Sequence, residues 1–351
     1  MNKYKPKVLI VQEVIPDYRI PVFNRLAEKY DITITTKEEW KKSEQFNVVA
    51  INFYGNKLFH FPITSNIFLK QFDVIIYSFN IRYLPLLYLL LIRRSLKIIL
   101  WGIGVTSENG FDVHNKFDKI RYFYANLARS VVFYSEYSRK KYIKEGHINP
   151  QKLFVAHNTL SLSSELYTDD KEYFVFVGSF KKYKRVDRFI ELLNQAYIIN
   201  PTLSKILMIG DGEYFAEAKQ HIYNFELSDK IHLLGAINDE MALQEIYRKS
   251  IASISPYQAG LSVLQSMAKG VPFVTLYDSI TGGERYNIIH LENGILAESE
   301  EDLVKHLIRL DNEKEFQLKL SHNAYNYFKN KCSIDNMAAG FEGAIKYTLN
   351  G

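Results

Sequence analysis

The apolar and polar positions of the stretch 250–276 predict a strand, a tight loop, a helix, a tight turn and a second strand. Apolar residues 251–254 predict a strand that ends before Pro256, because proline cannot donate to a central ladder. Apolar residues then recur at helical spacing up to Gly270, a residue type that commonly ends helices, and residues 271–275 predict a second strand. Such a strand–helix–strand unit is expected to be a parallel, right-handed crossover. An ordinary buried crossover helix without a ligand fits the same pattern.

Strands and helices alternate on both sides of this unit. Before it, strands are predicted at 7–12, 31–36, 47–53, 73–78, 97–101, 130–134 and 153–157, and helices at 20–30, 82–94, 116–129 and 137–146. From residue 173 on, further strands are predicted at 173–177, 205–209 and 230–234, and further helices at 185–199, 213–226, 239–250, 300–310, 314–329 and 333–348. This alternation is typical of doubly wound parallel sheets.

The polar segment 160–172 has no periodicity and is predicted to be a linker. It separates a Rossmann-like domain at 1–162 from a second one at 171–332, and the last helix, 333–351, is a candidate for packing back on the first domain. The fold class is therefore α/β, with two doubly wound parallel-sheet domains that face each other. Ligands of such sheets bind at the carboxyl ends of the strands, so a cleft is expected between the domains.

Cysteine usage and the apolar segments bear on the compartment. The single cysteine, Cys332, excludes an internal disulfide framework and fits a reducing compartment. The basic N-terminus leads into a strand and shows no signal peptide, which predicts a cytoplasmic protein. The most apolar segment, 83–92, is shorter than the roughly 20 residues that a transmembrane helix requires. It predicts a helix buried against the sheet, or alternatively one that dips into a membrane interface beside Arg93 and Arg94.

Charge is divided unequally along the chain. Residues 1–160 hold 24 Lys and Arg against 13 Asp and Glu, whereas residues 161–351 hold 20 against 26. A basic half predicts contact with anions, either lipid headgroups at the inner face of the cell membrane or a phosphorylated acceptor. The alternative is that both halves are simply solvated. No nucleic-acid partner is expected.

Glycine turns follow three predicted strands of the second half, at Gly178, at Gly210–Gly212 and at Gly235–Ala236. Each turn leads into a helix, so all three are expected to line one edge of one sheet, beside the helix that opens at Gly260. The N-terminus of that helix, Gly260–Val263, offers unpaired N–H groups and a partial positive charge to an anion. Together these features predict a phosphate-bearing ligand.

Basic residues cluster just after Gly178, at Lys181, Lys182, Lys184 and Arg185. They are candidate partners for a diphosphate, because lysine acts as a point charge and arginine binds bidentately. The alternative is a solvated basic loop.

On these residues the second half resembles glycosyltransferase family 4, whose members have the GT-B fold. Lys184 takes the place of the lysine that binds the donor diphosphate in the family's Gly-Arg-Leu-x₃-Lys segment, here 178–184, with Ser179 in place of the arginine. Gly210-Asp211-Gly212 is similar to the family's Gly-Asp-Gly turn near the donor. Residues 232–236 resemble the strand whose following backbone holds the base.

Further segments extend the resemblance over nearly the whole chain. Gly282-Gly283 and Asn293-Gly294 have the spacing of a Gly-Gly to Asn-Gly segment in the family. In the first half, segments 16–23, 101–104, 134–146 and 155–159 resemble a subset of the family. That subset often has histidine where Ile103 stands, and His114 is a speculative replacement.

The main departures concern carboxylates. Two glutamates that lie eight positions apart in the family correspond here to Tyr257 and Gln265. Gln265 is expected to hydrogen-bond a ribose hydroxyl as that glutamate does, whereas Tyr257 cannot act as a carboxylate toward the sugar. Tyr286 also replaces a usual glutamate, with Glu284 as the nearest substitute.

The resemblance implies a retaining, hexosyltransferase-like enzyme that moves a sugar from a nucleotide-diphosphate donor to a lipid-linked or polysaccharide acceptor in cell-surface glycan biosynthesis. The first domain would bind the acceptor and the second the nucleotide sugar. No Asp-x-Asp motif occurs, so no metal or cofactor is expected. Lys184 is the candidate catalytic residue. The candidate substrate-binding residues are Arg19, Gly178, Ser179, Lys181, Gly210, Gly212, Ala236, Tyr257, Gly260, Leu261, Ser262 and Gln265.

Two other functions fit the same pattern. One is a nucleotide-sugar epimerase on the same fold, which would not require an acceptor. The other is a degenerate transferase that binds a nucleotide sugar or a partner chain without catalysis. The lost glutamates and Ser179 favour the degenerate protein, whereas Lys184 and the glycine turns disfavour it.

Overall fold

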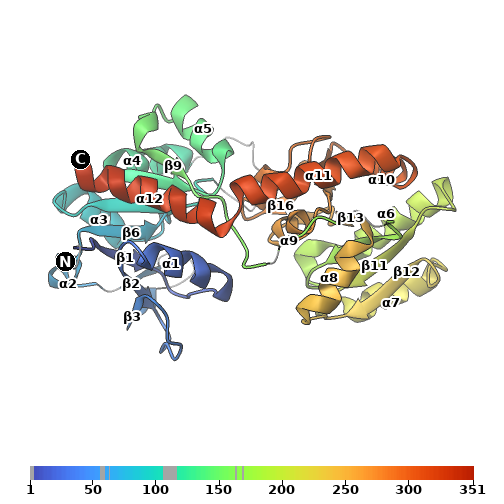
Figure 1. The fold of residues 1–351 in the computed structure, drawn as a ribbon, viewed down its shortest axis with the longest axis horizontal. Helices are drawn as coiled ribbons and strands as arrows, with labels where there is room; N and C mark the ends of the chain where they lie inside the picture. The colour runs from blue at the N-terminus through green and yellow to red at the C-terminus, as the bar shows by residue number, and fades with distance from the viewer. Residues whose placement is uncertain (1–3, 56–59, 63, 106–116, 163, 168–169) are drawn as a thin grey trace. The chain divides into compact units, whose positions relative to one another are not determined.

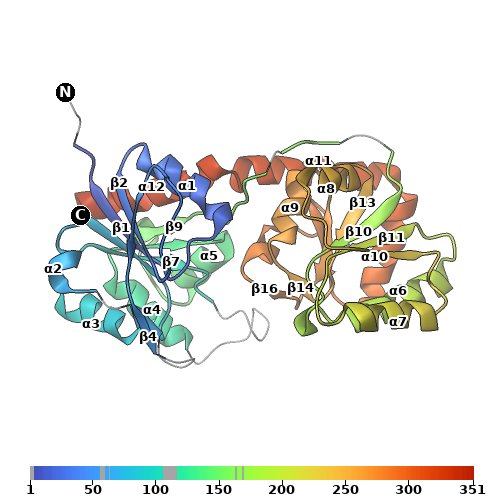
Figure 2. The ribbon, with the colours of Figure 1, turned by 90° about the horizontal axis from the view of Figure 1, so that it is seen from below.

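The computed structural model describes residues 4–55, 60–62, 64–105, 117–162, 164–167 and 170–351. The chain forms two compact units, each of which is described by itself (Figures 1 and 2). The N-terminal unit consists of the described residues up to Val105, residues 117–161 and the segment Lys331–Gly351. The C-terminal unit lies within residues 162–330.

The N-terminal unit is built on a seven-stranded parallel sheet with the order β3-β2-β1-β6-β7-β8-β9. Its strands are β1 (Lys7–Val11), β2 (Asp31–Thr36), β3 (Asn47–Ala50), β6 (Val74–Ser78), β7 (Ile98–Gly102), β8 (Ser130–Phe133) and β9 (Leu153–Val155). Its helices are α1 (Ile20–Ala27), α2 (Asn66–Leu69), α3 (Leu84–Ile92), α4 (Asp118–Leu127), α5 (Glu136–Lys144) and α12 (Ile334–Asn350). The order reverses between β1 and β6, as in a doubly wound fold.

Both faces of this sheet are buried, because alternate residues of each strand point to opposite sides. Val8 and Ile10 of β1 pack in one cluster with α1 and α12, while Leu9 and Val11 pack in another with α3, α4 and α5. Helix α12 lies on the first of these faces, where it contacts α1 and strands β6 to β9. Its close approach depends on Gly340, since a Cβ there would lie 2.3 Å from the Val155 carbonyl oxygen.

The C-terminal unit has a six-stranded parallel sheet with the order β12-β11-β10-β13-β15-β17. Its strands are β10 (Tyr173–Val177), β11 (Lys205–Ile209), β12 (Ile231–Gly235), β13 (Ser250–Ile254), β15 (Phe273–Leu276) and β17 (Gly294–Ala297). Its helices are α6 (Val186–Ile199), α7 (Phe215–Asn224), α8 (Glu240–Arg248), α9 (Ser262–Ala268), α10 (Glu300–Asn312) and α11 (Lys314–Lys331). The order reverses between β10 and β13, so the ligand edge of this sheet is expected where these two strands end.

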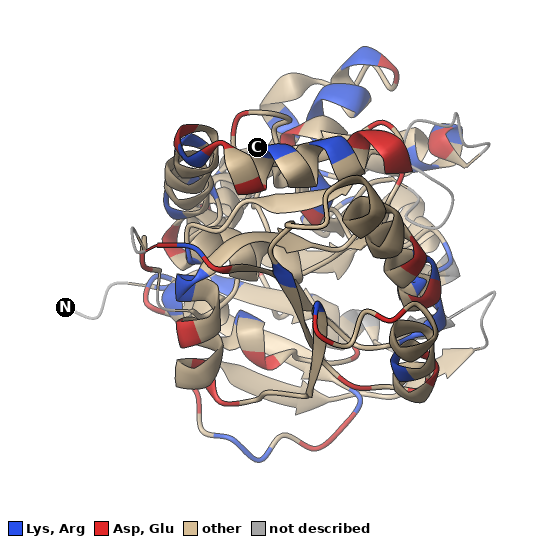
Figure 3. Ribbon diagram, turned by 90° about the vertical axis from the view of Figure 1, so that its right-hand side faces the viewer, with Lys and Arg blue, Asp and Glu red and all other residues tan. Residues whose placement is uncertain are grey.

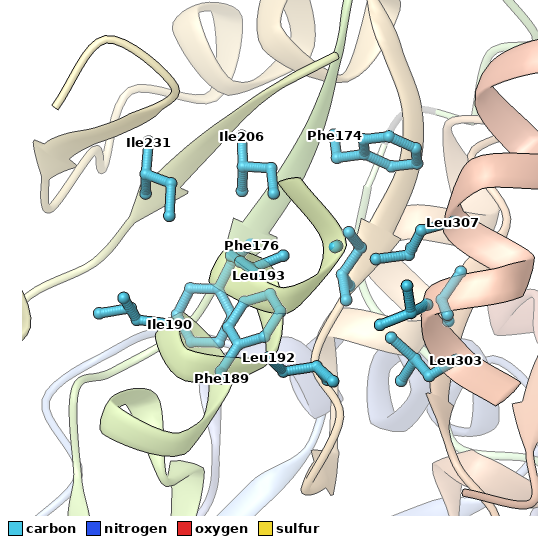
Figure 4. Packing of buried hydrophobic residues seen from close by; sticks show 14 of the residues in the cluster. Phe174, Phe176, Phe189, Ile190, Leu192, Leu193, Ile206, Ile231, Leu303 and Leu307 are labelled. Carbon is cyan, nitrogen blue, oxygen red and sulfur yellow. The ribbon is translucent and has the colours of Figure 1, made fainter. Parts of the chain in front are cut away.

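The larger core of the C-terminal unit lies between the sheet and helices α6 and α10 (Figure 4). Phe174 and Phe176 of β10 are completely or almost completely buried there, against Phe189 of α6 and Leu303 of α10. In Figure 3 the charged residues lie chiefly on helices and loops, and the strands are nearly free of them. The strands therefore form an apolar layer, and the charged side chains lie on the helices and loops around it.

The central stretch folds as predicted, because β13 and β15 are parallel neighbours joined through α9. The predicted strand 47–53 is wrong at its C-terminal end, which lies too far along the chain. The ladder with β2 stops at Ala50, and residues 53–55 (β4, Phe53–Gly55) pair instead with β5 (His60–Pro62) in an antiparallel hairpin. Within the described residues, no helix is long and apolar enough to cross a membrane.

Candidate functional site

The three glycine turns lie side by side at the carboxyl edge of the C-terminal sheet. The Gly178 N–H donates to the Ile209 carbonyl oxygen at 2.9 Å, and the Gly210 N–H donates to the Gly235 carbonyl oxygen at 2.8 Å. A third bond joins the Phe180 N–H to the Asp211 carbonyl oxygen at 2.9 Å. The turns after β10, β11 and β12 therefore form one connected backbone surface.

Glycine is required where these turns touch. Gly210 has a φ of +140°, and a Cβ there would lie only 1.9 Å from the Gly178 carbonyl oxygen. Gly212 has a φ of +153°, and its Cβ would lie 2.6 Å from the Phe180 carbonyl oxygen. Neither position accepts a side chain without movement of the neighbouring backbone.

Lys184 is the one buried residue of the basic loop, with 6% of its surface exposed. It ends the 3₁₀ turn Lys182–Lys184, and its Nζ lies 5.4 Å from the Phe176 ring centroid and 3.4 Å from Ser255 Oγ, to which it donates. A Cβ on Gly178 would lie 3.0 Å from the same Nζ, so the absence of a side chain at Gly178 leaves room for the ammonium.

Burial lowers the pKa of Lys184 to about 8 from its usual 10.5, because the low-dielectric surroundings disfavour the charged form. Its ammonium forms no ion pair within the described part of the chain. A diphosphate beside Nζ would supply the missing opposite charge and stabilise the charged lysine. Lys184 is thus a buried cation that an anionic ligand would stabilise.

Hydroxyl groups fix the loop between β13 and α9. Ser255 Oγ donates to the Gln258 carbonyl oxygen at 2.7 Å, and Thr275 Oγ1 donates to the Ser255 carbonyl oxygen at 2.8 Å. The loop is held further by a two-stranded pairing of β14 (Gln258–Ala259) with β16 (Ile280–Thr281). Ser255 therefore links the loop to Lys184, a role that the residue pattern alone did not indicate.

Helix α9 begins at Ser262, with Leu261 as its N-cap residue, directly after Gly260. Ser262 Oγ is buried and has no hydrogen-bond partner among the described residues. Gln265 lies one turn further on, is half-buried, and its side-chain amide forms no hydrogen bond with the described residues. Both side chains keep their hydrogen-bonding capacity for a ligand, since buried polar groups are normally satisfied.

Tyr257 packs within the C-terminal core, and its contact with a ligand stays a prediction. Its hydroxyl donates to Glu300 Oε1 at 2.7 Å, and its ring lies 4.5 Å below the Arg185 guanidinium carbon. Glu300 is held in turn by Arg188, with contacts of 3.2 Å and 2.6 Å. Burial, followed by the bond to Glu300, raises the pKa of Tyr257 far above its usual value. The residue therefore supports the basic loop from beneath.

The Gly282-Gly283 segment forms a second loop of the C-terminal unit. Thr281 Oγ1 accepts hydrogen bonds from the N–H groups of Gly283, at 3.0 Å, and Arg285, at 3.1 Å. Glu284 is buried, and its carboxylate folds back over Gly282, where a Cβ would lie 2.9 Å from Oε2. The substitute carboxylate expected at Glu284 is thus placed against the glycine pair.

The remaining candidates lie outside these contacts. Ser179 is half-buried, Lys181 and Ala236 are exposed, and none of the three bonds through its side chain to Lys184. Arg19 belongs to the N-terminal unit, where its guanidinium carbon lies 4.6 Å above the Trp101 ring and its NH2 group donates to the Tyr134 hydroxyl at 2.9 Å. Its contact with an acceptor stays a prediction. His114 lies outside the described residues.

The described residues contain no group of three or more His, Cys, Asp or Glu side chains arranged to hold a metal ion. The cations at the ligand edge include the Lys184 ammonium and the exposed basic side chains before α6. This set is suited to binding a phosphate oxygen directly.

Similarity to solved structures identifies the fold class. A solved structure of Anabaena HepE in complex with UDP superposes with a TM-score of 0.69 at 12% identity, over 97% of this chain and 99% of that one. A solved glycosyltransferase structure from Rickettsia africae superposes with a TM-score of 0.69 at 13% identity, over 99% of this chain and 100% of that one. The two Rossmann-like units therefore have the GT-B fold of glycosyltransferases.

The family follows from the sequence match. Residues 162–327 match the family of glycosyl transferases group 1, so the C-terminal unit belongs to it and the resemblance to the family 4 type is confirmed there. The N-acetyl-alpha-D-glucosaminyl L-malate synthase of Bacillus anthracis is 26% identical over 131 residues, 37% of this chain and 33% of that protein. The alpha-monoglucosyldiacylglycerol synthase of Acholeplasma laidlawii is 27% identical over 152 residues, 43% of this chain and 37% of that protein. The matched region thus spans about a third of each relative's length.

Proposed function

We propose that this chain is a retaining glycosyltransferase that moves a sugar from a nucleoside-diphosphate donor to a lipid-linked or polysaccharide acceptor. The observation that carries the proposal is the buried Lys184 ammonium at the switch point of the C-terminal sheet, which forms no ion pair with the described residues. Support also comes from the relatives, since HepE is solved with UDP and the Acholeplasma protein is named for a glucosyl lipid.

In the proposed reaction the acceptor oxygen forms a bond to the sugar's anomeric carbon on the face from which the diphosphate leaves. The bond from that carbon to the diphosphate oxygen breaks, and the acceptor's proton passes to the departing diphosphate. Negative charge grows on the leaving oxygen, and a preorganised cation there lowers the barrier. Lys184 supplies that cation, Ser262 and Gln265 bind the donor, and Arg19 is assigned to the acceptor side.

A degenerate, ligand-binding protein remains the second candidate. Tyr257 favours it, because this side chain brings no carboxylate and its hydroxyl is committed to Glu300. A transfer assay separates the two candidates.

The test is release of nucleoside diphosphate from a panel of nucleotide sugars, with and without a lipid-linked acceptor. We expect release that depends on the acceptor and persists in EDTA, because lysine and backbone groups provide the charge stabilisation. Activity that disappears in EDTA and returns with magnesium or manganese would contradict the role of Lys184. Binding of a nucleotide sugar without release, for every acceptor tried, would establish the degenerate protein.

We further propose that the N-terminal unit contacts an anionic membrane peripherally at the cytoplasmic face. The excess of 24 Lys and Arg over 13 Asp and Glu in residues 1–160 supports this contact, since each basic residue near an anionic surface contributes about 1 kcal/mol. It would bring a lipid-linked acceptor to the protein.

A further inference from the structure

Arg185 has a backbone conformation that residues with a side chain rarely adopt. Its φ of 46° and ψ of 52° lie in the left-handed region, which a Cβ atom makes unfavourable. The chain reverses at Arg185 from the 3₁₀ turn Lys182–Lys184 into α6, and the Arg185 N–H donates to the Lys182 carbonyl oxygen at 3.1 Å. Residues in such conformations persist only where surrounding contacts hold them, and they gather at binding sites.

The reversal places two neighbouring cations at different depths. Lys184 is buried and donates to Ser255 Oγ. Arg185 is exposed, and its guanidinium carbon lies 4.5 Å from the Tyr257 ring centroid. Ser255 and Tyr257 both belong to the loop after β13, while the two cations follow β10. The cations therefore join the ends of the two strands between which the sheet order reverses, where such sheets bind their ligands.

The guanidinium of Arg185 keeps its charge and its N–H donors available. Its side chain forms no ion pair and no hydrogen bond with the described residues. The Tyr257 ring attracts the cation through its face, and this contact involves no carboxylate that would neutralise the charge. A guanidinium can bind two phosphate oxygens at once through its planar fork of donors. The side chain is therefore suited to an anion with several oxygens.

Tyr257 is itself fixed in position. Its ring is 7% exposed and packs in the core with residues of α6 and α10, and its hydroxyl donates to Glu300 Oε1 at 2.7 Å. The Glu300 carboxylate is paired with Arg188 of α6, whose NH2 group lies 2.6 Å from Oε2. A carboxylate at position 257 could pair with Arg185 and cancel its charge. Tyrosine orients the same cation and leaves the charge in place.

We propose that Arg185 binds the diphosphate of the nucleotide donor beside Lys184, and that Tyr257 is the residue that positions Arg185. The inference rests on the proposed function and adds a second cation to its donor site. Lys184 would contact the diphosphate from within the fold, and Arg185 from the exposed side of the loop. Tyr257 thereby gains a role in donor binding that requires no carboxylate.

The first test is calorimetric titration of full-length proteins with UDP, ADP, GDP, CDP and thymidine diphosphate. The wild type is compared with Arg185→Gln, which keeps the left-handed strain and loses the charge, and with the control Lys219→Gln, which removes one exposed charge from α7. We expect Arg185→Gln to bind the preferred diphosphate at least about tenfold more weakly, because hydrogen bonds between charged groups are lost. The control should bind like the wild type.

The positioning role of Tyr257 is tested by the same titration on three further variants. Tyr257→Leu removes the ring and should weaken binding about fivefold, whereas Tyr257→Phe keeps the ring beneath Arg185 and should retain most of the affinity. Because Tyr257 acts through Arg185, Arg185→Gln/Tyr257→Leu should bind no more weakly than Arg185→Gln alone. A merely structural tyrosine would weaken binding equally in both backgrounds. Unchanged melting temperatures of Arg185→Gln and Tyr257→Phe confirm that these variants fold.

The possible outcomes separate the inference from the proposed function. Wild-type affinity in Arg185→Gln, or an equal loss in Lys219→Gln, would overturn the inference while leaving the donor site. Losses that add up in the double variant, or a Tyr257→Phe protein as weak as Tyr257→Leu, would overturn the role of Tyr257. A wild type that binds none of the diphosphates would overturn the proposed function and the inference together.

Discussion

Lys184→Ala is expected to lower kcat about a hundredfold or more. The Nζ of Lys184 is buried, lacks an ion pair in the described part of the chain and lies against Gly178, at the edge where the diphosphate is proposed to leave. Its charge acts on negative charge that grows in the transition state. Removal of one preorganised electrostatic donor commonly costs about 10² to 10³ in rate.

Gln265→Ala provides the matched control within the same site. Its neutral amide is expected to bind a ribose hydroxyl, and one such hydrogen bond contributes about 0.5–1.5 kcal/mol. The variant should therefore weaken donor binding only several-fold and leave kcat nearly unchanged. Equal kcat losses in the two variants, or an unchanged kcat in Lys184→Ala, would contradict the assigned roles.

The pH profile gives an independent readout of Lys184. Because burial lowers its pKa to about 8, the free protein holds this charge below pH 8 and loses it as the pH rises. The kcat/KM of the wild type and of Gln265→Ala should fall above pH 8. The limb should be absent in the residual activity of Lys184→Ala.

Gly210→Ala should destabilise the C-terminal unit by about 3 kcal/mol, or about 6–12 °C in melting temperature. Residues with a side chain rarely adopt its φ of +140°, and the new Cβ would lie 1.9 Å from the Gly178 carbonyl oxygen. The new Cβ would force the turns after β10 and β11 apart. The backbone of these turns forms the ligand edge of the sheet.

Gly235→Ala is the matched control, because Gly235 also has a positive φ, +71°, but a Cβ there would meet nothing within 4 Å. It should cost only the strain of the left-handed conformation, about 1–2 kcal/mol. The measurement is thermal unfolding of both variants. Equal melting temperatures would show that the packing of the glycine turns does not stabilise the unit.

Most of the fold could be predicted from hydrophobic periodicity, since the central strands of both sheets are buried on both faces and are largely apolar. Strand β10 was predicted at its observed bounds for this reason. Strand β17 was not predicted, because Asn293-Gly294 was interpreted only as part of the Gly-Gly to Asn-Gly segment. In the structure Gly294 begins a strand, where a Cβ would lie 2.7 Å from the Phe273 carbonyl oxygen. A close approach between strands leaves no periodic signal.

Only part of the candidate site could be predicted from the sequence. The glycine turns could be found because they come where strands end, and Lys184 because it lies in the loop after the first of these strands. Parallel strands bring such residues to one edge. The hydrogen bond between Tyr257 and Glu300 could not be predicted, because 43 positions separate the two residues. Likewise, the link from Lys184 to Ser255 spans 71 positions. Contacts of this kind depend on how helices pack on the sheet.

A nucleotide-sugar site built around Lys184 is tested most directly by thermal-shift measurements on the wild type and on Lys184→Ala, with a panel of nucleoside diphosphates and their sugars. A ligand present at a hundred times its dissociation constant stabilises a protein by about 2.7 kcal/mol. We expect at least one nucleoside diphosphate and its sugar to raise the melting temperature of the wild type, and the shift largely to disappear in Lys184→Ala. The absence of any shift in the wild type, or an equal shift in both proteins, would contradict a nucleotide-sugar site built around Lys184.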